Sequence, residues 1–347
     1  MSKQFGGKVT KALENSYGRS EHWDGKKFLN IEETSMNISP SKIPKLFYKQ
    51  FFEKSGRAPK KKLPILPFEQ DAFLSPSERT KIIWYGHSVA LLRIAGKTIL
   101  IDPMLGPNAA PISPFPIRRF SENTLNLINS FPEIDLVLMT HDHYDHLDLA
   151  SIAMLKPKVK QYFVALGTSR HLESWGISKD IIQEFDWWNT ANFEDIEITF
   201  TPTRHFSGRG LTDRAKCLWG GWVLKYQTEN IYFSGDSGYG QHFKEVGSKL
   251  GPFDLGLMEC GQYNENWHQI HMFPEEAVQA ARDAKAQTIM PVHWAGFALA
   301  QHPWKDPFER FIKACADAQQ AFIVPRLGEL VNLNILTDST EYWKALE

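Results

Sequence analysis

The chain has 347 residues, with 39 Lys and Arg against 40 Asp and Glu and 42% hydrophobic residues, a composition typical of one or two globular domains. This composition excludes disordered, collagen-like and coiled-coil proteins. No window reaches the roughly 18–20 uninterrupted apolar residues of a membrane-spanning helix, and the first thirty residues lack the apolar core of a signal peptide, so we expect a cytoplasmic protein.

The first segment of the chain is basic. Residues 1–62 contain 14 Lys and Arg against 6 Asp and Glu, a net charge of +8, which leaves −9 for the rest because the total is −1. Apolar residues at helical spacing predict a short amphipathic helix over 43–52. We expect residues 1–80 to form a leader that packs on or beside a second domain, residues 81–347. Two interpretations of the helix stay open: its apolar face packs onto the protein's own core, or it makes peripheral contact with the inner face of a membrane.

From residue 81 onward, short β-rich apolar runs alternate with turns and a few helical stretches. The expected strands are 81–85, 90–94, 98–101, 136–140, 161–165, 197–201, 221–226, 231–234, 255–259, 288–292 and 330–333. Helices are expected at 149–155, 274–284 and 306–319, the second of which is opened by Pro274 and two glutamates. Many strands with interspersed helices predict an α/β fold arranged as a layered sandwich.

The loop after the strand that ends at residue 140 holds three histidines and a carboxylate within six residues: His141, His143, Asp145 and His146. In extended backbone, residues two apart point the same way, so the first three can converge while the turn brings His146 round. Imidazole and carboxylate are ligands that Zn²⁺ accepts, and a strand-end loop can hold them outside the core. The pattern therefore predicts a metal site.

One loop cannot close two metal sites, so further ligands are expected at other strand ends. Three candidates each follow a β-rich apolar run: His205, Asp236 and His293. Taken alone, each would more often be a structural histidine or a turn aspartate, but as a set placed like the first loop they favour metal binding. Seven ligands predict a dinuclear site, with two Zn²⁺ as the expected cofactor and other divalent transition metals as alternatives.

This His-x-His-x-Asp-His loop, followed downstream by His, Asp and His, resembles the signature of the metallo-β-lactamase superfamily. The resemblance implies an αβ/βα sandwich with the dinuclear metal site at one edge. It also implies the ligand sets: His141, His143 and His205 for the first metal, Asp145, His146 and His293 for the second, and Asp236 as the bridge.

From Trp84 to about Leu330 the chain is similar, more specifically, to the N-acyl-phosphatidylethanolamine-hydrolysing phospholipase D family and its bacterial relatives. The matching pieces occur in the same order: WYGHSVALLRI, ILIDPML, THDHYDHLD, DWW, LWGGWVL, FSGDSGY, GPFDLGLMECGQY, HMFPEEAV and PVHWAGFALA. The resemblance implies hydrolysis of a phospholipid-like phosphodiester and a role in lipid metabolism. Residues 43–52 resemble an apolar segment beside the lipid entrance in that family.

The ligand types favour hydrolysis over other metal chemistry. A hydroxide that bridges two zinc ions is a nucleophile at neutral pH, and the same cations can clamp phosphoryl oxygens. His143 stands where the superfamily's di-iron reductases have Glu, and Asp236 where its antibiotic-hydrolysing enzymes commonly have Cys, so redox and β-lactamase activities are disfavoured. The alternatives are another hydrolase with the same site, such as a lactonase or a nuclease, and a non-catalytic metal-binding protein. The negative charge of residues 63–347 argues against a nucleic-acid partner.

Other residues receive roles from their position or from the resemblance. Asp145 and Asp236 are expected to act in catalysis together with His271, which the resemblance places near the leaving group, where it would protonate the alkoxide or position the phosphate. A structural histidine is the alternative for His271. His87 is expected to brace the ligands from behind, with a hydrogen-bonded turn histidine as the alternative, and the resemblance implies that Asp102 braces the metal loop by hydrogen bonds. Three aromatic residues are expected to line a substrate pocket or, equally, to pack in the core: Tyr239, Tyr263 and Trp294.

Overall fold

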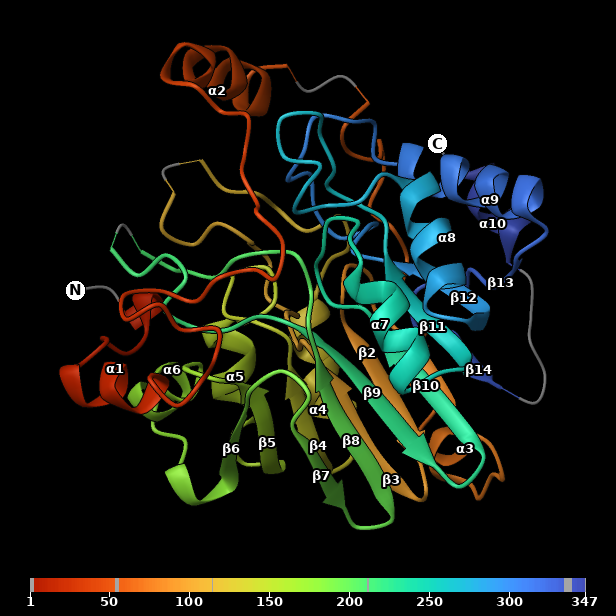
Figure 1. Ribbon diagram of the computed structural model, residues 1–347. Coiled ribbons are helices and arrows are strands. Elements are labelled where there is room, and N and C mark those ends of the chain that lie inside the picture. The colour runs from red at the N-terminus through yellow and green to blue at the C-terminus, as the bar shows by residue number, and fades with distance from the viewer. Residues whose placement is uncertain (1–2, 54–55, 114, 211, 334–338, 347) are drawn as a thin grey trace.

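The computed structural model describes residues 3–53, 56–113, 115–210, 212–333 and 339–346. Two seven-stranded sheets face each other and carry helices on their outer sides, the αβ/βα sandwich expected from the sequence (Figure 1). The first sheet has the order β14-β1-β2-β3-β4-β5-β6 and the second β13-β12-β11-β10-β9-β8-β7. The strands are β1 (Lys81–Trp84), β2 (Ala90–Ile94), β3 (Lys97–Ile101), β4 (Ile134–Met139), β5 (Val159–Ala165), β6 (Ile182–Phe185), β7 (Thr190–Phe193), β8 (Ile196–Thr201), β9 (Gly221–Tyr226), β10 (Glu229–Phe233), β11 (Phe253–Glu259), β12 (Ala286–Val292), β13 (Ala321–Phe322) and β14 (Leu330–Asn332).

The helices make the outer layers. α3, α4, α5 and α6 contribute apolar side chains to the outer face of the first sheet, while α7, α8 and α9 lie on the side of the second (Figure 1). The α-helices are α1 (Lys11–Tyr17), α2 (Ile43–Phe51), α3 (Gln70–Leu74), α4 (Leu127–Ser130), α5 (Leu149–Leu155), α6 (Ser169–Ser174), α7 (His242–Lys249), α8 (Pro274–Asp283), α9 (Asp306–Ala318) and α10 (Thr340–Ala345).

Local sequence signals explain where two of these helices begin. The Asp148 carboxylate caps α5 by accepting a hydrogen bond from the Ser151 N–H at 2.8 Å. In α8, Pro274 occupies the first turn, and the Glu276 carboxylate accepts a hydrogen bond from the Phe273 N–H at 3.0 Å. Each start was predicted from the sequence at the same residue.

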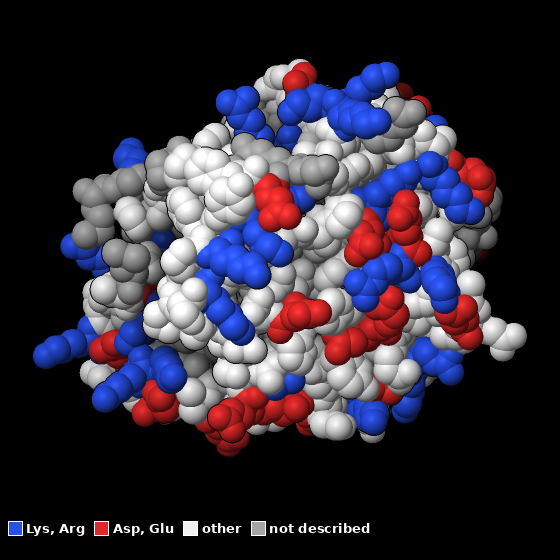
Figure 2. Space-filling model, turned by 90° about the horizontal axis from the view of Figure 1, so that it is seen from above, with Lys and Arg blue, Asp and Glu red and all other residues white. Residues whose placement is uncertain are grey.

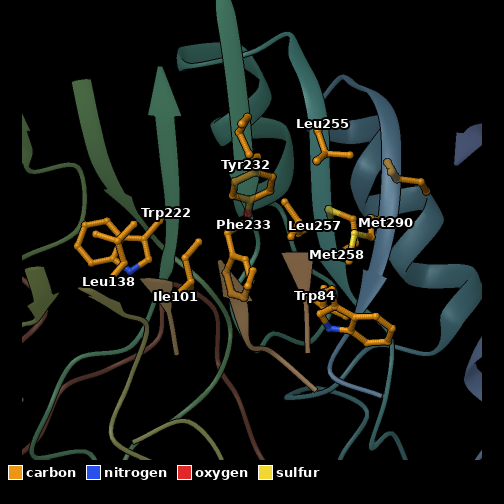
Figure 3. Close-up of a cluster of buried hydrophobic side chains, with 14 of the residues drawn as sticks. Trp84, Ile101, Leu138, Trp222, Tyr232, Phe233, Leu255, Leu257, Met258 and Met290 are labelled. Atoms are coloured by element: carbon orange, nitrogen blue, oxygen red, sulfur yellow. The ribbon is translucent and has the colours of Figure 1, made fainter. Parts of the chain in front are cut away.

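The main core lies between the two sheets. Figure 3 shows Ile101 and Leu138 of the first sheet with Trp222 and Phe233 of the second in this layer. Alternate residues of β4 pack in two different cores. Leu138 faces the second sheet, whereas Val137 faces the helices of the outer layer. Burial on both faces explains why β4 is an almost unbroken apolar run.

The direction of the strands brings their carboxyl ends to one edge. β3 is parallel to β4, and β10, β11 and β12 are mutually parallel. β1 and β8 are each separated from a parallel partner by one antiparallel strand, so they point the same way as that partner. The loops that follow these strands lie at the upper edge of the sandwich in Figure 1, and every predicted metal ligand is in one of them.

The leader lies on this body and partly enters it. Tyr17 and Phe28 belong to the main core, whereas α2 stands out at the top of the molecule (Figure 1). The apolar side of α2 is exposed, since Phe47 is 46% and Phe52 60% accessible. Packing onto the protein's own core, one of the two interpretations of this helix, does not describe these rings. Within the described ranges, no helix combines the length and apolarity needed to cross a membrane.

All strands and helices expected after residue 80 are present, with ends shifted by at most two residues. The sequence did not predict β6, β7 and β13. Each lies at or next to the far end of a sheet, and β6 and β7 leave most of their side chains partly or fully exposed. Their sequences therefore lack the apolar run by which buried strands are recognised.

Candidate metal centre

Two strand-end loops are joined at the base of the site. The His87 N–H donates to the Trp294 carbonyl at 2.7 Å, and the His293 N–H donates to the His87 carbonyl at 2.9 Å. These bonds link the end of β1 in the first sheet to the end of β12 in the second. His87 and His293 both have left-handed backbone, with φ of 54° and 66°. Such conformations are uncommon for residues other than glycine and are concentrated at functional sites.

Three ring nitrogens form what we call the first cluster: His141 Nε2, His143 Nδ1 and His205 Nε2. The His143 nitrogen lies 2.9 Å from that of His141 and 3.2 Å from that of His205. The opposite nitrogens of His141 and His205 are placed to donate, to the Thr140 hydroxyl at 3.0 Å and the Ile270 carbonyl at 3.0 Å. Two unprotonated nitrogens therefore face the same space. Their lone pairs repel each other unless a cation lies between them.

Four side chains form the second cluster: Asp145, His146, His293 and Asp236. The Asp145 Oδ2 lies 3.7 Å from His146 Nε2 and 3.4 Å from His293 Nε2. The other nitrogen of His146, Nδ1, is 2.7 Å from Asp102 Oδ2. Asp102 also accepts hydrogen bonds from the backbone and hydroxyl of Thr140, at 2.8 and 2.6 Å. Asp102 thus contacts both the His146 ring and the start of the 141–146 loop, and its bracing role stays a prediction.

Asp236 lies between the two clusters. Its Oδ2 is 3.1 Å from His146 Nε2 and 3.0 Å from His293 Nε2, and 3.9 Å from both His141 Nε2 and His205 Nε2. Its Oδ1 is buried and has no hydrogen-bond partner within the described part of the chain. A buried carboxylate oxygen without a donor is costly, and a metal ion would satisfy it. The donor set of the two clusters therefore fits a pair of divalent metal ions.

The protonation states fit the same occupant. Burial lowers the pKa of His141, His143 and His205, which keeps these rings neutral and able to bind a metal. Burial opposes ionisation of Asp236, but His146 and His293 outweigh it and hold the pKa of that carboxyl well below its usual range. In return, the carboxylates of Asp236, Asp145 and Asp102 overcome burial and raise the pKa of His146 to about 10. The second cluster thus attracts positive charge.

His271 lies at the open side of the site. Its ring faces those of His205 and His293 at centroid distances of 5.0 and 5.2 Å, and its side chain is 14% exposed. The Nδ1 atom is 3.0 Å from Glu259 Oε1 and is placed to donate to it. Glu259 also accepts from the Met272 N–H at 3.1 Å, and its Oε1 is 3.4 Å from His293 Nδ1. His271 is therefore oriented with its other nitrogen available to the site.

Glu259 is a residue of the site to which sequence analysis gave no role. It is the last residue of β11, so it sits at a strand end like the predicted ligands. Its position could have indicated a site residue from the sequence, because a carboxylate at the end of an apolar strand is exceptional. The residue is buried.

His87 contacts the carboxylate of a predicted ligand. Its Nε2 lies 2.9 Å from Asp145 Oδ2, and its ring packs on that of His293 at a centroid distance of 4.2 Å. Burial lowers the pKa of His87 to about 3, so the ring is neutral and donates to Asp145. The bracing role of His87 stays a prediction.

The three aromatic candidates are not gathered at the metals. The Tyr239 hydroxyl donates to Asp283 at 2.5 Å, and Trp294 is buried in the core against Trp84 and Trp343. Tyr263 donates to Asp306 and lines a cavity of about 530 Å³ beside α2. Their substrate contacts stay predictions, and core packing describes the position of Trp294.

Comparison with known families and proteins gives a consistent result. Residues 97–294 match the family model described as the beta-lactamase superfamily domain. The chain is 34% identical over 310 residues to an uncharacterised protein of Mycobacterium tuberculosis, covering 88% of this chain and 82% of that protein. It is 30% identical over 286 residues to N-acyl-phosphatidylethanolamine-hydrolyzing phospholipase D 1 of Caenorhabditis elegans, covering 77% of this chain and 80% of that protein.

A similar fold is found among solved structures. A metallo hydrolase of the archaeon Ignicoccus hospitalis superposes with a TM-score of 0.57 at 22% identity, covering 73% of this chain and 97% of that one. At 22% identity the match shows a shared fold alone.

Proposed function

Because the chain belongs to the metallo-β-lactamase superfamily of metal-dependent hydrolases, we propose that it hydrolyses the phosphodiester of a phospholipid similar to N-acyl-phosphatidylethanolamine. The products would be phosphatidic acid and an N-acylethanolamine, as in phospholipase D chemistry. We further propose two Zn²⁺ as the metals, since imidazole and carboxylate donors suit this ion.

The observation that carries the proposal is the placement of Asp236 between two sets of ligands, with His271 beside them. Asp236 Oδ2 lies within 3.9 Å of nitrogens from both clusters, so one carboxylate serves both metal positions. Two metal positions about one carboxylate suit a phosphoryl group, which offers several oxygens to cations. The similarity to the Caenorhabditis elegans enzyme over most of both chains supports this substrate class.

The chain's own residues would perform the remaining steps. Bound metal ions supply an activated water at neutral pH and neutralise charge on the phosphoryl oxygens. His271, fixed at Nδ1 by Glu259, would donate a proton from its other nitrogen to the departing alkoxide oxygen. Glu259 would stabilise the charged ring before that transfer. Asp102 and His87 would keep His146 and Asp145 in place while the substrate binds.

The exposed side of α2 supports a lipid substrate. Ring contacts at 5.7–6.4 Å join four exposed aromatic residues, which we call the aromatic cluster: Phe47, Tyr48, Phe52 and Phe115. Lys42, Lys45 and Lys49 of the same segment line the cavity beside it. Figure 2 shows this end of the molecule from above, with Lys and Arg patches next to uncharged areas. We propose that this surface contacts an anionic membrane at its cytoplasmic face.

A panel of substrates tests the proposed reaction. Zinc-loaded protein would be incubated with N-acyl-phosphatidylethanolamine vesicles, a short soluble phosphodiester, an acyl lactone and a thioester. We expect phosphatidic acid and N-acylethanolamine from the first, at a rate above those of the lactone and the thioester. Faster hydrolysis of the lactone or the thioester would reject the phosphodiesterase proposal while leaving the metal centre intact.

A further inference from the structure

The leader contains a segment that follows the rim of the metal centre. Residues 28–37, which we call the strap, make hydrogen bonds along their length with the loops of the second sheet. The Phe28 N–H donates to the Ala215 carbonyl at 2.9 Å, and the Asn37 N–H to the Asn266 carbonyl at 2.7 Å. Between them, Glu32 accepts from the Gln241 N–H at 2.7 Å and the Ser35 N–H donates to Gln269 at 2.8 Å. The strap is therefore fixed along its length.

One strap residue, Asn30, binds the backbone of a predicted metal ligand. Its Nδ2 donates to the His205 carbonyl at 2.8 Å, and its Oδ1 accepts from the His205 N–H at 3.0 Å. The same Oδ1 accepts from Trp219 Nε1 at 3.1 Å. A single side-chain amide thus pairs with both main-chain groups of His205, as a neighbouring strand would.

His205 depends on this pairing because it lies beyond the sheet. β8 ends at Thr201, so the ladder that fixes the strand does not reach residue 205. The residue is 1% exposed, and buried main-chain groups require partners. The Ile270 carbonyl fixes the orientation of the His205 ring at Nδ1. The position of the ring is fixed only if the Cα atom of His205 is also held in place. Asn30 supplies that second constraint.

We propose that Asn30 is a positioning residue for His205 and that the strap is therefore a functional part of the first metal position. This inference rests on the proposed role of His205 as a ligand. Without the amide, the 202–207 loop would keep its fold but let the imidazole depart from the other two rings of the first cluster. The metal of that cluster would then bind more weakly, while the second cluster, which has no strap contact among the described residues, would be spared.

The test compares Asn30→Ala with Thr34→Val, a matched change in the same strap. The Thr34 hydroxyl accepts from Arg204 Nε at 3.0 Å, so its loss also removes a strap hydrogen bond, but among the described residues no hydrogen bond joins Thr34 to His205. Metal-loaded wild type and both variants would be mixed with a chromophoric zinc chelator, and the release of each metal would be followed. The visible absorption of the Co²⁺-loaded proteins would be recorded beside it, since this spectrum reports ligand geometry.

For Asn30→Ala we expect one of two metals to bind about 10–100-fold more weakly, the usual effect of losing a support behind a ligand. Its Co²⁺ spectrum should change, whereas Thr34→Val should match wild type in both measurements even if both variants melt at a lower temperature. Asn30→Asp, which keeps only the acceptor, should fall between them. Equal metal release from Asn30→Ala and Thr34→Val would overturn the inference. A wild type that binds no metal would overturn the metal centre itself, a separate and recognisable failure.

Discussion

Three imidazoles of the metal centre are held by a contact on the nitrogen that faces away from the metals. Thr140 serves His141, Asp102 serves His146, and the Ile270 carbonyl serves His205. These partners fix both the tautomer and the rotation of each ring. The positions of these rings are therefore fixed in the folded protein before a metal binds. The entropy lost in ordering the ligands is lost on folding and not on metal binding.

The proposed bridging role of Asp236 leads to a prediction at this scale. Asp236→Asn removes the charge that serves both clusters, so we expect the variant to lose at least one of two metals per chain and nearly all hydrolytic activity. Metal content by mass spectrometry of the purified protein checks this. Asp195→Asn, at an exposed position, is the control and should keep both metals. An active Asp236→Asn variant with two metals would exclude the bridge.

His271 should behave differently from a ligand. We expect His271→Ala to keep both metals and to lose activity by about 10²-fold, the usual size of a general acid or base effect. Glu259→Gln should lose less, because it weakens the support of the ring and leaves His271 itself in place. Loss of a metal from His271→Ala would make it a ligand instead of a proton donor, and unchanged turnover would leave it a structural residue.

The predicted ligands could be recognised from sequence because each combines a metal-binding residue type with a strand end. The spacing of His141, His143 and Asp145 also follows the two-residue period of extended chain. Glu259 carries the same strand-end signal, although sequence analysis gave it no role. Asn30 carried no signal at all, since its contact with His205 spans 175 residues and depends on the path of the leader. Contacts of this kind are a property of tertiary packing.

At the scale of elements, α2 carries the membrane proposal. Replacing both Phe47 and Phe52 with Ser should weaken co-sedimentation with anionic vesicles and slow the hydrolysis of vesicular substrate, because apolar area that enters the lipid is lost. Turnover of a short soluble phosphodiester and the melting temperature should stay as in wild type, since both rings are exposed. Ile31→Ser, at an exposed apolar residue of the strap, is the control for surface change.

The opposite result would be informative. A Phe47→Ser, Phe52→Ser protein that binds vesicles as well as wild type would end the membrane proposal for α2. The sequence predicted this helix but could not place its apolar side, because an amphipathic pattern is the same whether the face meets a core or a lipid. The exposure of the rings decides against the core.

The loop before α9 makes the stability of the protein depend on pH. His302 accepts a hydrogen bond from the Gln262 N–H at Nε2, 3.0 Å, and donates from Nδ1 to the Pro303 carbonyl, 2.9 Å, so its ring is neutral. Burial lowers its pKa to about 4. Between about pH 6.5 and pH 4 the unfolded chain takes up a proton that the folded chain does not, so the free energy of unfolding falls as pH falls.

We expect this histidine to account for about 2 kcal/mol of the stability lost between pH 7 and pH 5. Urea unfolding at both pH values would measure it, with His302→Gln as the variant that cannot titrate. The pH-dependent loss should be smaller in His302→Gln than in wild type. Equal losses in the two proteins would show that His302 is already protonated in the folded state at pH 5.

For the whole molecule, the pattern of strands was enough to predict a layered α/β sandwich, because short apolar strands with interspersed helices bury their faces against one another in layers. The resemblance added the αβ/βα arrangement. The sequence could not predict how the leader is routed. Residues 1–80 were expected to pack on or beside the second domain, but the sequence did not show that Tyr17 and Phe28 enter the main core or that the strap follows the candidate metal centre. The charge of a segment indicates that its side chains contact solvent, but it does not determine the path of the backbone.

The central claim is that water attacks the phosphorus of a phospholipid phosphodiester and that the P–O bond to the N-acylethanolamine breaks. The most direct measurement is hydrolysis of N-acyl-phosphatidylethanolamine vesicles in ¹⁸O-water, with mass spectrometry of the products and Asp236→Asn as the inactive control. We predict one ¹⁸O atom in phosphatidic acid and none in N-acylethanolamine. Label in a released fatty acid, or diacylglycerol among the products, would mean that a different bond is broken and would contradict the account.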